Sequence, residues 1–500
     1  MFRLSRIIPK GHKFRLSGHA AQLSFILLAG LLNGCAWLPE DGMRAKLLDM
    51  PSLKQTLNAD AQAEKIVSEW PRAQWWQEFH NAELNRLVET ALKDSPSLHA
   101  AAARLTQAEA VADFQAAEML PSIGASVELH QRRFSATDFY GPNGGQTFTG
   151  AYIDPAVFRY HLDLWGKDKA ALEAALGKEK AQASELAMAR LMLSTAIARS
   201  YIRLCSAEED VELAQALVKK AEEKMQLAEL RWQRGLAAKD SVYAGEQQVE
   251  AARQRETTVH NQAQTLRNRL AALAGQGPDW GKNIRVGEIE IAGHLPQPEA
   301  LSLGLLAHRP DVAAAMWQVE SAAQLIKVAK TRFYPDVNLV GFAGLRSLNL
   351  KDLFLSHGAS VAYGIGPTLT LPVFEGGRLE AELKNQQASY DAAVESYNGT
   401  LLTAVQQVAD SLADWRKTVE HDAAQERALE AAEAASTLAG KRYRAGLSDR
   451  DGIIDAEAAL IRQRLTASEL KNAHLLAAVG LIEALGGGYE NTTMRMSRTP

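Results

Sequence analysis

The chain has 500 residues, a formal net charge of −4, and 47% hydrophobic and 23% charged residues, a composition typical of a folded protein and not of a disordered one. Two cysteines are too few for a disulfide framework. The first 34 residues contain five basic residues and no acidic one, and their removal would change the net charge to −9. An acidic mature chain argues against a nucleic-acid partner.

Residues 1–34 have the pattern of an export signal. Basic residues precede a mostly apolar run from Ala20 to Leu32, which is too short to span a bilayer as a helix. The run ends in "LLNGC", which resembles a bacterial lipobox, so we expect cleavage before Cys35 and attachment of lipid, including palmitate, to it. The alternative is a buried cysteine beside an uncleaved anchor. Ala36 in the next position favours sorting to the outer membrane, and no later segment has 18 continuous apolar residues.

The rest of the chain is a tandem duplication. Two proline pairs, Pro96 with Pro121 and Pro310 with Pro335, bracket stretches of equal length that lie 214 residues apart. "RWQRGLAAKD" at 231–240 matches "RYRAGLSDRD" at 442–451. Repeats of this kind indicate that one structural plan occurs twice. The expected organisation is, in chain order, a signal peptide (1–34), a lipidated N-terminal segment (35–95), a first repeat (96–274), a linker (275–309), a second repeat (310–486) and a C-terminal tail (487–500).

Each repeat is expected to contain a helix, two strands, a long helix and a return helix. The expected ranges are 97–119, 122–134, 148–164, 167–232 and 239–274 in the first repeat, and 311–332, 336–347, 359–373, 378–444 and 449–485 in the second. The strands at 148–164 and 359–373 alternate apolar and polar residues, while the strand at 336–347 alternates poorly and is assigned by symmetry. Such alternation is typical of membrane barrel strands. Strands of a soluble sandwich alternate as well, but they leave the lipoprotein signal and the long helices unexplained.

The helix lengths predict a tube. Residues 167–232 contain no proline and one glycine, Gly177, so one helix of about 99 Å is expected there. The two shorter helices of the repeat, about 54 Å and about 35 Å, nearly match it when they are placed end to end. Ala-rich helices pack closely. Four strands cannot close a membrane barrel by themselves, and open edges in lipid are costly. The chain must then oligomerise, with eight strands from a dimer or twelve from a trimer.

Several motifs resemble those of the TolC/OprM family of outer-membrane efflux channels (outer membrane factors), and specifically its NodT-type lipoprotein branch. "GPTLTLPVFEGGR" at 366–378 resembles the family's second strand-to-helix signature, and "HLDLWGKDKAALEAA" at 161–175 resembles the corresponding element of the first repeat. "LLAHRPDVAAA", "WPRAQWWQEF" and "LGGGYEN" resemble further family segments. The resemblance covers residues 35–490. It implies an α+β membrane protein whose homotrimer forms a 12-stranded β-barrel and a long periplasmic α-helical tunnel.

The resemblance also implies a function and partners. Channels of this family export drugs or toxic small molecules as passive conduits, together with a periplasmic adaptor (membrane fusion) protein and an inner-membrane pump. We expect a pump of the major-facilitator, aromatic-acid or RND type, a position in the outer membrane with contact to its lipid, a lipid anchor at Cys35, and a helical tunnel in the periplasm.

Two groups of candidate site residues follow. Gly235 and Gly446 suit the left-handed residue that a helix-to-helix turn requires, while Leu236 and Leu447 beside them resemble the family's adaptor-docking motif. Simple capping by Asp240 and Asp451 is the alternative, and the two can coexist. Asp455 matches an aspartate that lines the periplasmic gate in the family, and Asp451 or Asp449 could take part or cap the helix instead. A solvated helix face is the alternative for Asp455.

No enzyme is expected from this sequence. The twelve histidines form no "HExxH" or similar ligand spacing, and a Walker-type loop and a nucleophile elbow are also missing from the sequence, so no catalytic residue, metal site or cofactor is expected. Trp75 and Trp76 are expected to pack the N-terminal segment, and Cys205 is expected to be a buried helix residue. The competing hypothesis is a periplasmic coiled-coil scaffold lipoprotein without a pore, which leaves the four amphipathic strands without a purpose.

Overall fold

The computed structural model describes residues 42–49, 51, 70–137, 144–291, 308–354 and 358–490. The export signal and Cys35 lie outside the described residues. The elements, in chain order, are η2 (Trp75–Phe79), α3 (Ala82–Asp94), α4 (Pro96–Glu118), β1 (Ser122–Arg133), β2 (Thr147–His161), α5 (Lys167–Gln233), α6 (Asp240–Leu273), α7 (Pro278–Gly281), α9 (Pro310–Thr331), β3 (Asp336–Ser347), η4 (Leu350–Asp352), β4 (Val361–Thr370), α10 (Arg378–Arg444) and α11 (Arg450–Ala484).

The chain divides into two compact units, and each unit contains parts of both sequence repeats. One unit, the sheet unit, holds the four strands with the helix ends that adjoin them, in 114–174 and 322–390. The other, the helical unit, holds most of the helical residues, in 45–113, 175–321 and 391–500. The long helices α5 and α10 have residues in both units.

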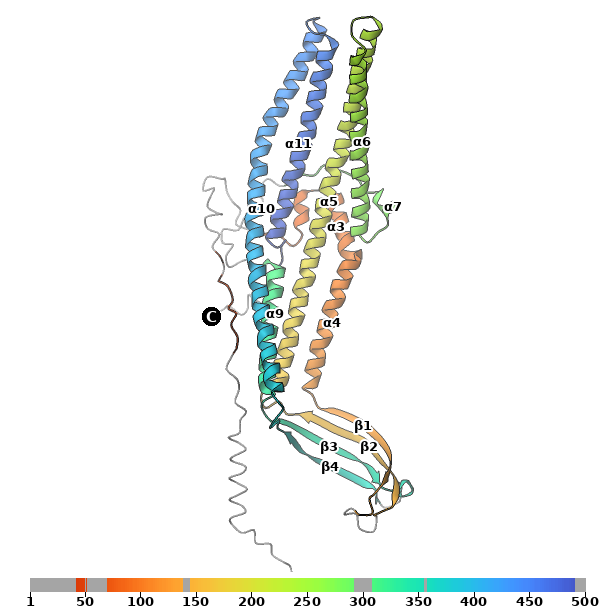
Figure 1. Ribbon diagram of the computed structural model, residues 1–500, viewed down its shortest axis with the longest axis vertical. Helices are drawn as coiled ribbons and strands as arrows, with labels where there is room; N and C mark the ends of the chain where they lie inside the picture. The colour runs from red at the N-terminus through yellow and green to blue at the C-terminus, as the bar shows by residue number, and fades with distance from the viewer. Residues whose placement is uncertain are drawn as a thin grey trace, which may run out of the picture. The chain divides into compact units, whose positions relative to one another are not determined.

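The sheet unit is built on one antiparallel sheet with the strand order β1-β2-β3-β4 (Figure 1). The two repeats meet in its centre, where β2 pairs with β3 from Ala151↔Ser347 to His161↔Asn338. A buried aspartate, Asp154, lies at an irregularity of this ladder and accepts two hydrogen bonds from Arg346, at 2.8 and 3.2 Å. β1 pairs only with β2, and β4 only with β3. Within the described chain, the outer edges of β1 and β4 therefore have no strand partner.

β2 and β4 each end three residues earlier than the sequence predicts. β2 ends at His161 and not at 164, because the following residues form a turn: Asp163 accepts a 3.0 Å hydrogen bond from the Lys169 N–H, and Gly166 has a φ of +75°. β4 spans Val361–Thr370 and not 359–373. Pro372 cannot donate to a ladder, and Gly376 and Gly377 with φ of +60° and +84° turn the chain into α10.

In the helical unit the long helices form two hairpins, α5 with α6 and α10 with α11 (Figure 1). α5 and α10 each have 67 residues, which corresponds to about 100 Å. Small residues bring the helices close together. A Cβ added at Gly245 of α6 would lie 3.1 Å from the Cα of Met225 on α5, so only glycine fits that contact without a shift.

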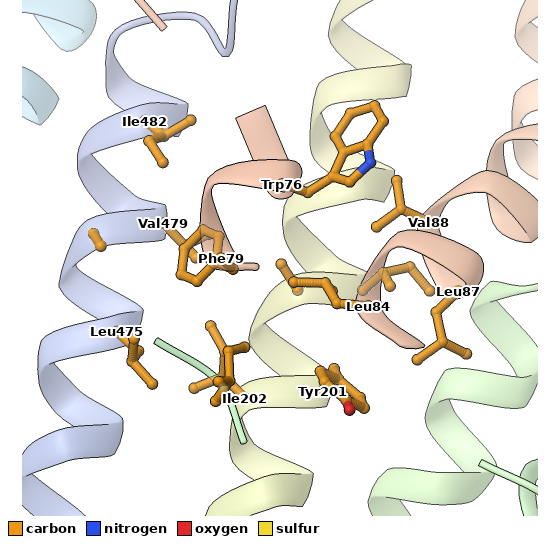
Figure 2. Packing of buried hydrophobic residues seen from close by; sticks show 14 of the residues in the cluster. Trp76, Phe79, Leu84, Leu87, Val88, Tyr201, Ile202, Leu475, Val479 and Ile482 are labelled. Carbon is orange, nitrogen blue, oxygen red and sulfur yellow. The ribbon is translucent and has the colours of Figure 1, made fainter. Parts of the chain in front are cut away.

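The main hydrophobic core joins the N-terminal segment to helices of both repeats. Trp75, Trp76 and Phe79 of η2 are buried in this core. Figure 2 shows Trp76 and Phe79 between α5 and α11. The core also contains apolar residues of α3, α5 and α11, namely Leu84, Leu87, Val88, Tyr201, Ile202, Leu475, Val479 and Ile482. The predicted packing role of Trp75 and Trp76 is confirmed. Cys205 lies on α5 beside this core and is partly buried, and burial raises the pKa of its thiol to about 11.

Candidate functional site

The candidate site consists of the two turns that connect the long helices to their return helices. We call residues 234–239, between α5 and α6, the first tip, and residues 445–449, between α10 and α11, the second tip. The sequence indicates both as adaptor-docking positions, and the predicted gate residues lie at or just after the second.

Both tips have the same turn. Gly235 has a φ of +70° and Gly446 a φ of +71°, so each occupies the left-handed conformation that glycine adopts without strain. At the first tip the Gly235 N–H donates to Trp232 O at 2.8 Å and the Leu236 N–H donates to Arg231 O at 2.8 Å. At the second tip Gly446 and Leu447 donate to Tyr443 O at 3.0 Å and Arg442 O at 2.9 Å. This pair of hydrogen bonds is the Schellman motif, which satisfies the last carbonyls of a helix.

An apolar side chain projects from each tip. Leu236 is 75% exposed and Leu447 is 78% exposed in the chain. Open space also surrounds both glycines, since a Cβ built at either position has no neighbour within 4 Å. Each tip therefore presents a leucine on a fixed turn with room for a partner beside it.

Of the three aspartates that the sequence offers as helix caps, Asp449 caps α11, and Asp240 and Asp451 do not act as N-caps. Asp449 is the N-cap of α11, and its carboxylate accepts from the Gly452 N–H at 3.2 Å. Asp451 lies one residue inside the helix and contacts Arg231 instead, so it is not the cap. At the first tip the N-cap is Lys239, which makes no side-chain cap, and Asp240 accepts only from the Ser241 N–H at 2.8 Å.

Acidic residues of α11 pair with basic residues of α5. Arg231 contacts Asp451 and donates to Asp449 at 3.0 Å. Lys224 Nζ lies 2.5 Å from Asp455 Oδ1, and Lys220 Nζ lies 2.9 Å from Glu457 Oε2. We call this set the α5–α11 ion-pair ladder. It joins a helix of the first repeat to a helix of the second within one chain.

The hydrogen bonds around this ladder raise the pKa values of two of its basic residues, Arg231 and Lys220. The hydrogen bond to Asp451 raises the pKa of Arg231 above its ordinary value. Partial burial lowers the pKa of Lys220, but hydrogen bonds to Glu223 and Glu457 outweigh this effect and raise it. Both side chains therefore remain cationic throughout the physiological pH range.

Asp455 is the acidic residue that the sequence proposes for the gate. Its side chain is 58% exposed. It forms an ion pair with Lys224. Sequence reasoning missed Lys220, Lys224 and Arg231. Their spacing of four and seven residues is the signal that could have found them, since residues so spaced share one face of a helix.

Among the described residues, no helix is long and apolar enough to cross a membrane. The amphipathic alternation predicted for the strands is present in the exposed apolar residues of β4, where Val361, Tyr363 and Ile365 are each more than half exposed. Thr368 and Thr370 lie at the alternate positions of the same strand, which belong to its opposite face.

A family model described as "Outer membrane efflux protein" matches the chain twice, over residues 87–276 and 302–487. The chain belongs to this family. Each match covers one whole sequence repeat. The multidrug resistance outer membrane protein MdtQ from Escherichia coli O6:H1 is 31% identical to it over 470 residues, which are 92% of this chain and 96% of MdtQ. MdtP, the multidrug resistance outer membrane protein of Escherichia coli K12, is 28% identical over 94% of this chain and 98% of MdtP.

The fold is also similar to that of a solved outer membrane protein. The outer membrane protein VceC from Vibrio cholerae matches with a TM-score of 0.75 and 34% identity, over 84% of this chain and all of VceC. The predicted family and fold class, that of an outer-membrane efflux channel with strands and long helices in each repeat, are confirmed. The protein is an outer-membrane efflux protein by family, sequence and fold.

Proposed function

We propose that three copies of this chain form a continuous conduit, a twelve-stranded β-barrel in the outer membrane joined to a helical tunnel in the periplasm, through which drugs or toxic small molecules leave the cell. The observation that carries the proposal is the four-stranded sheet whose outer strands, β1 and β4, pair on one side only. Unpaired edges in lipid would leave backbone N–H and C=O groups without partners. Pairing β4 of one copy with β1 of the next removes every edge, and twelve strands result from three copies.

The exposed side chains of β4 support the same assembly. Tyr363 and Ile365 are 82% and 73% exposed in the single chain and lie two residues apart, on one face of the strand. An apolar outer face is what a barrel strand needs against lipid. The competing scaffold without a pore gives this face no purpose.

A substitution pair tests the barrel. Ile365→Arg places a cation on the proposed lipid face and should reduce insertion, since such a charge costs about 2–4 kcal/mol at the bilayer midplane. Thr368→Arg on the opposite face should leave insertion unchanged and alter ion conductance in planar bilayers. Native mass spectrometry of the wild type should give three chains per particle. A conducting dimer would favour an eight-stranded barrel instead, while particles that do not conduct would favour the scaffold.

The partners are proposed from the family and from the tips. We infer that a periplasmic adaptor binds Gly235, Leu236, Gly446 and Leu447, six tips per trimer, and that it connects the channel to an inner-membrane pump of the major-facilitator, aromatic-acid or RND type. The fixed turns and the exposed leucines support this inference. The names of MdtQ and MdtP, multidrug resistance proteins, support drugs as cargo.

The gate is proposed at the start of α11. Three copies of Asp455 around one narrow axis, with Asp451 one turn earlier, would form acidic rings that favour cations. The α5–α11 ion-pair ladder supports a closed state, because it holds these acids against α5.

A lipid on Cys35 is proposed as a second anchor. Because the barrel itself holds the protein in the membrane, Cys35→Ser should leave an unprocessed precursor that retains part of its export activity. Mass spectrometry of the mature N-terminus checks this, and a first residue other than Cys35 would exclude the lipidation.

A further inference from the structure

Three potential metal ligands converge where β2 turns into α5. His161 is the last residue of β2, Asp163 lies in the turn, and Asp168 lies in the first turn of α5. One ligand atom from each of these side chains lies within 4.8 Å of the other two. His161 and Asp168 are already in contact, through Nδ1 and Oδ2. Neither is much exposed, at 19% and 15% of the side chain.

A second observation points to a cation here. The Asp163 Oδ1 atom is buried and has no hydrogen-bond partner among the described residues, while its Oδ2 accepts from the Lys169 N–H at 3.0 Å. A buried carboxylate oxygen without a donor is costly, and a bound cation would satisfy it. The backbone hydrogen bond fixes the carboxylate, so its direction does not depend on the ion.

The second ring nitrogen of His161, Nε2, lies near a carboxylate, that of Asp336. His161 Nε2 lies 3.4 Å from Asp336 Oδ1, and Asp336 is in turn held by Asn338 at 2.6 Å and faces Lys167 Nζ at 3.5 Å. A ligating histidine usually donates its second N–H to a carboxylate, which fixes the tautomer and the ring direction. In that tautomer Nδ1 carries a lone pair, and a bound ion would take the place of the present contact between Nδ1 and Asp168 Oδ2.

Two contacts of Trp165 hold the turn against the start of β3. Trp165 stacks on Tyr334 with ring centroids 5.1 Å apart, and its Nε1 donates to Pro335 O at 2.7 Å. A pocket of about 330 Å³ opens beside His161, Asp163 and Asp336 and gives a hydrated ion a way in. Two ligands of a four-coordinate zinc ion lie about 3.3 Å apart, so the three side chains need only small rotations to bind one.

We propose that His161, Asp163 and Asp168 bind one divalent transition-metal ion of the zinc class, which ties the end of β2 to the first turn of α5. One imidazole and two carboxylates favour zinc over calcium or magnesium, which prefer oxygen ligands alone. Water completes the coordination from the pocket. The corresponding junction between β4 and α10 has no histidine, and Glu375 there contacts Arg378. The metal is therefore expected at one junction per chain.

The test is zinc binding to the metal-stripped, detergent-purified protein by isothermal calorimetry. We expect one zinc ion per chain in the wild type, loss of that ion in His161→Gln and in Asp163→Asn, and retention in His260→Gln, whose histidine is exposed on α6. Asp336→Asn should keep the ion but weaken its affinity by about 10- to 100-fold. Native mass spectrometry checks that each variant assembles like the wild type.

X-ray absorption of the zinc-loaded wild type gives a readout that needs no variant. One imidazole nitrogen together with oxygen ligands would support the site. A shell of several histidines, no retained zinc, or binding equal to wild type in His161→Gln and Asp163→Asn would overturn it, and His161 would then be a plain ion-pair partner of Asp168 and Asp336.

Discussion

The two tips share one turn but differ in their charge pairing. Residues 231–240 and 442–451 correspond position by position, so Arg231 matches Arg442 and Asp240 matches Asp451. Both turns are Schellman motifs with nearly equal glycine φ angles. Arg231, just before the first tip, pairs with Asp451, just after the second. In the part of the chain that the structure describes, neither Arg442 nor Asp240 makes an ion pair.

The comparison shows that the turn depends on the residues of its own repeat, whereas the ion pair depends on which helix lies beside it. A turn needs only its own residues, so both copies form it. An ion pair between helices needs a second helix, and α5 has α11 of the same chain beside it. In a ring of three chains, α10 would meet α6 of the next copy. We therefore expect Arg442 of one chain to pair with Asp240 of the neighbouring chain, as Arg231 pairs with Asp451.

The largest effect is expected from the feature that the tips share. Gly446→Val or Gly235→Val forces a β-branched residue into the left-handed region, which costs about 1–2 kcal/mol and displaces the neighbouring leucine. Export in a drug-susceptibility assay should be lost while trimers still form. Gly399→Val is the control, because Gly399 lies inside α10 with open space around it. Normal export in the tip variants would limit the glycines to helix termination.

An intermediate effect is expected from the feature in which the tips differ. Arg231→Glu breaks the pair within the chain, and Arg442→Glu breaks the proposed pair between chains. Each should raise the resting conductance of trimers in planar bilayers, by about two- to fivefold for an exposed pair. Asp451→Arg should restore the first variant and Asp240→Arg the second.

The crosswise combinations are the controls for this experiment. Arg231→Glu with Asp240→Arg, and Arg442→Glu with Asp451→Arg, should not recover the low conductance. If Asp240→Arg leaves Arg442→Glu unchanged, the pairing between neighbouring chains does not occur.

The smallest effect is expected at Asp455 of α11, whose counterpart on α6 is the uncharged Ala244. Asp455→Ala removes a carboxylate from the proposed ring, so cation selectivity and block by divalent cations should both decrease. Lys224→Ala removes the cation beside the same carboxylate and should change selectivity in the opposite direction. Reversal potentials in a salt gradient measure both. Equal selectivity in all three proteins would place Asp455 on an ordinary solvated surface.

The sequence predicts the long elements closely because their signals are continuous. α5 was expected over 167–232 and spans Lys167–Gln233, and β3, assigned by symmetry alone, spans its expected range. α3 was not predicted as an element within the N-terminal segment. Its signal was nonetheless present: Asn81 caps it through a 2.8 Å hydrogen bond from the Leu84 N–H, and Leu84, Leu87 and Val88 have helical spacing.

The site was predictable only where it is local. The left-handed residue that ends a helix is usually glycine, so Gly235 and Gly446 could be recognised from the sequence alone. The partners of Asp451 and Asp455 lie more than 200 residues away on α5, and no local pattern connects them. The cluster of His161, Asp163 and Asp168 is close in sequence, but its convergence depends on the turn at Gly166.

The core in Figure 2 also determines when the protein can fold. Trp75 and Phe79 come before the first repeat, while Leu475, Val479 and Ile482 come at the end of the second, so the core cannot close until almost the whole chain has been exported. Contacts at such sequence separation slow folding. Until α11 is present, Trp75 and Phe79 lack the apolar residues of α11 that belong to this core. A chain that stops before α11 should be degraded rather than assembled.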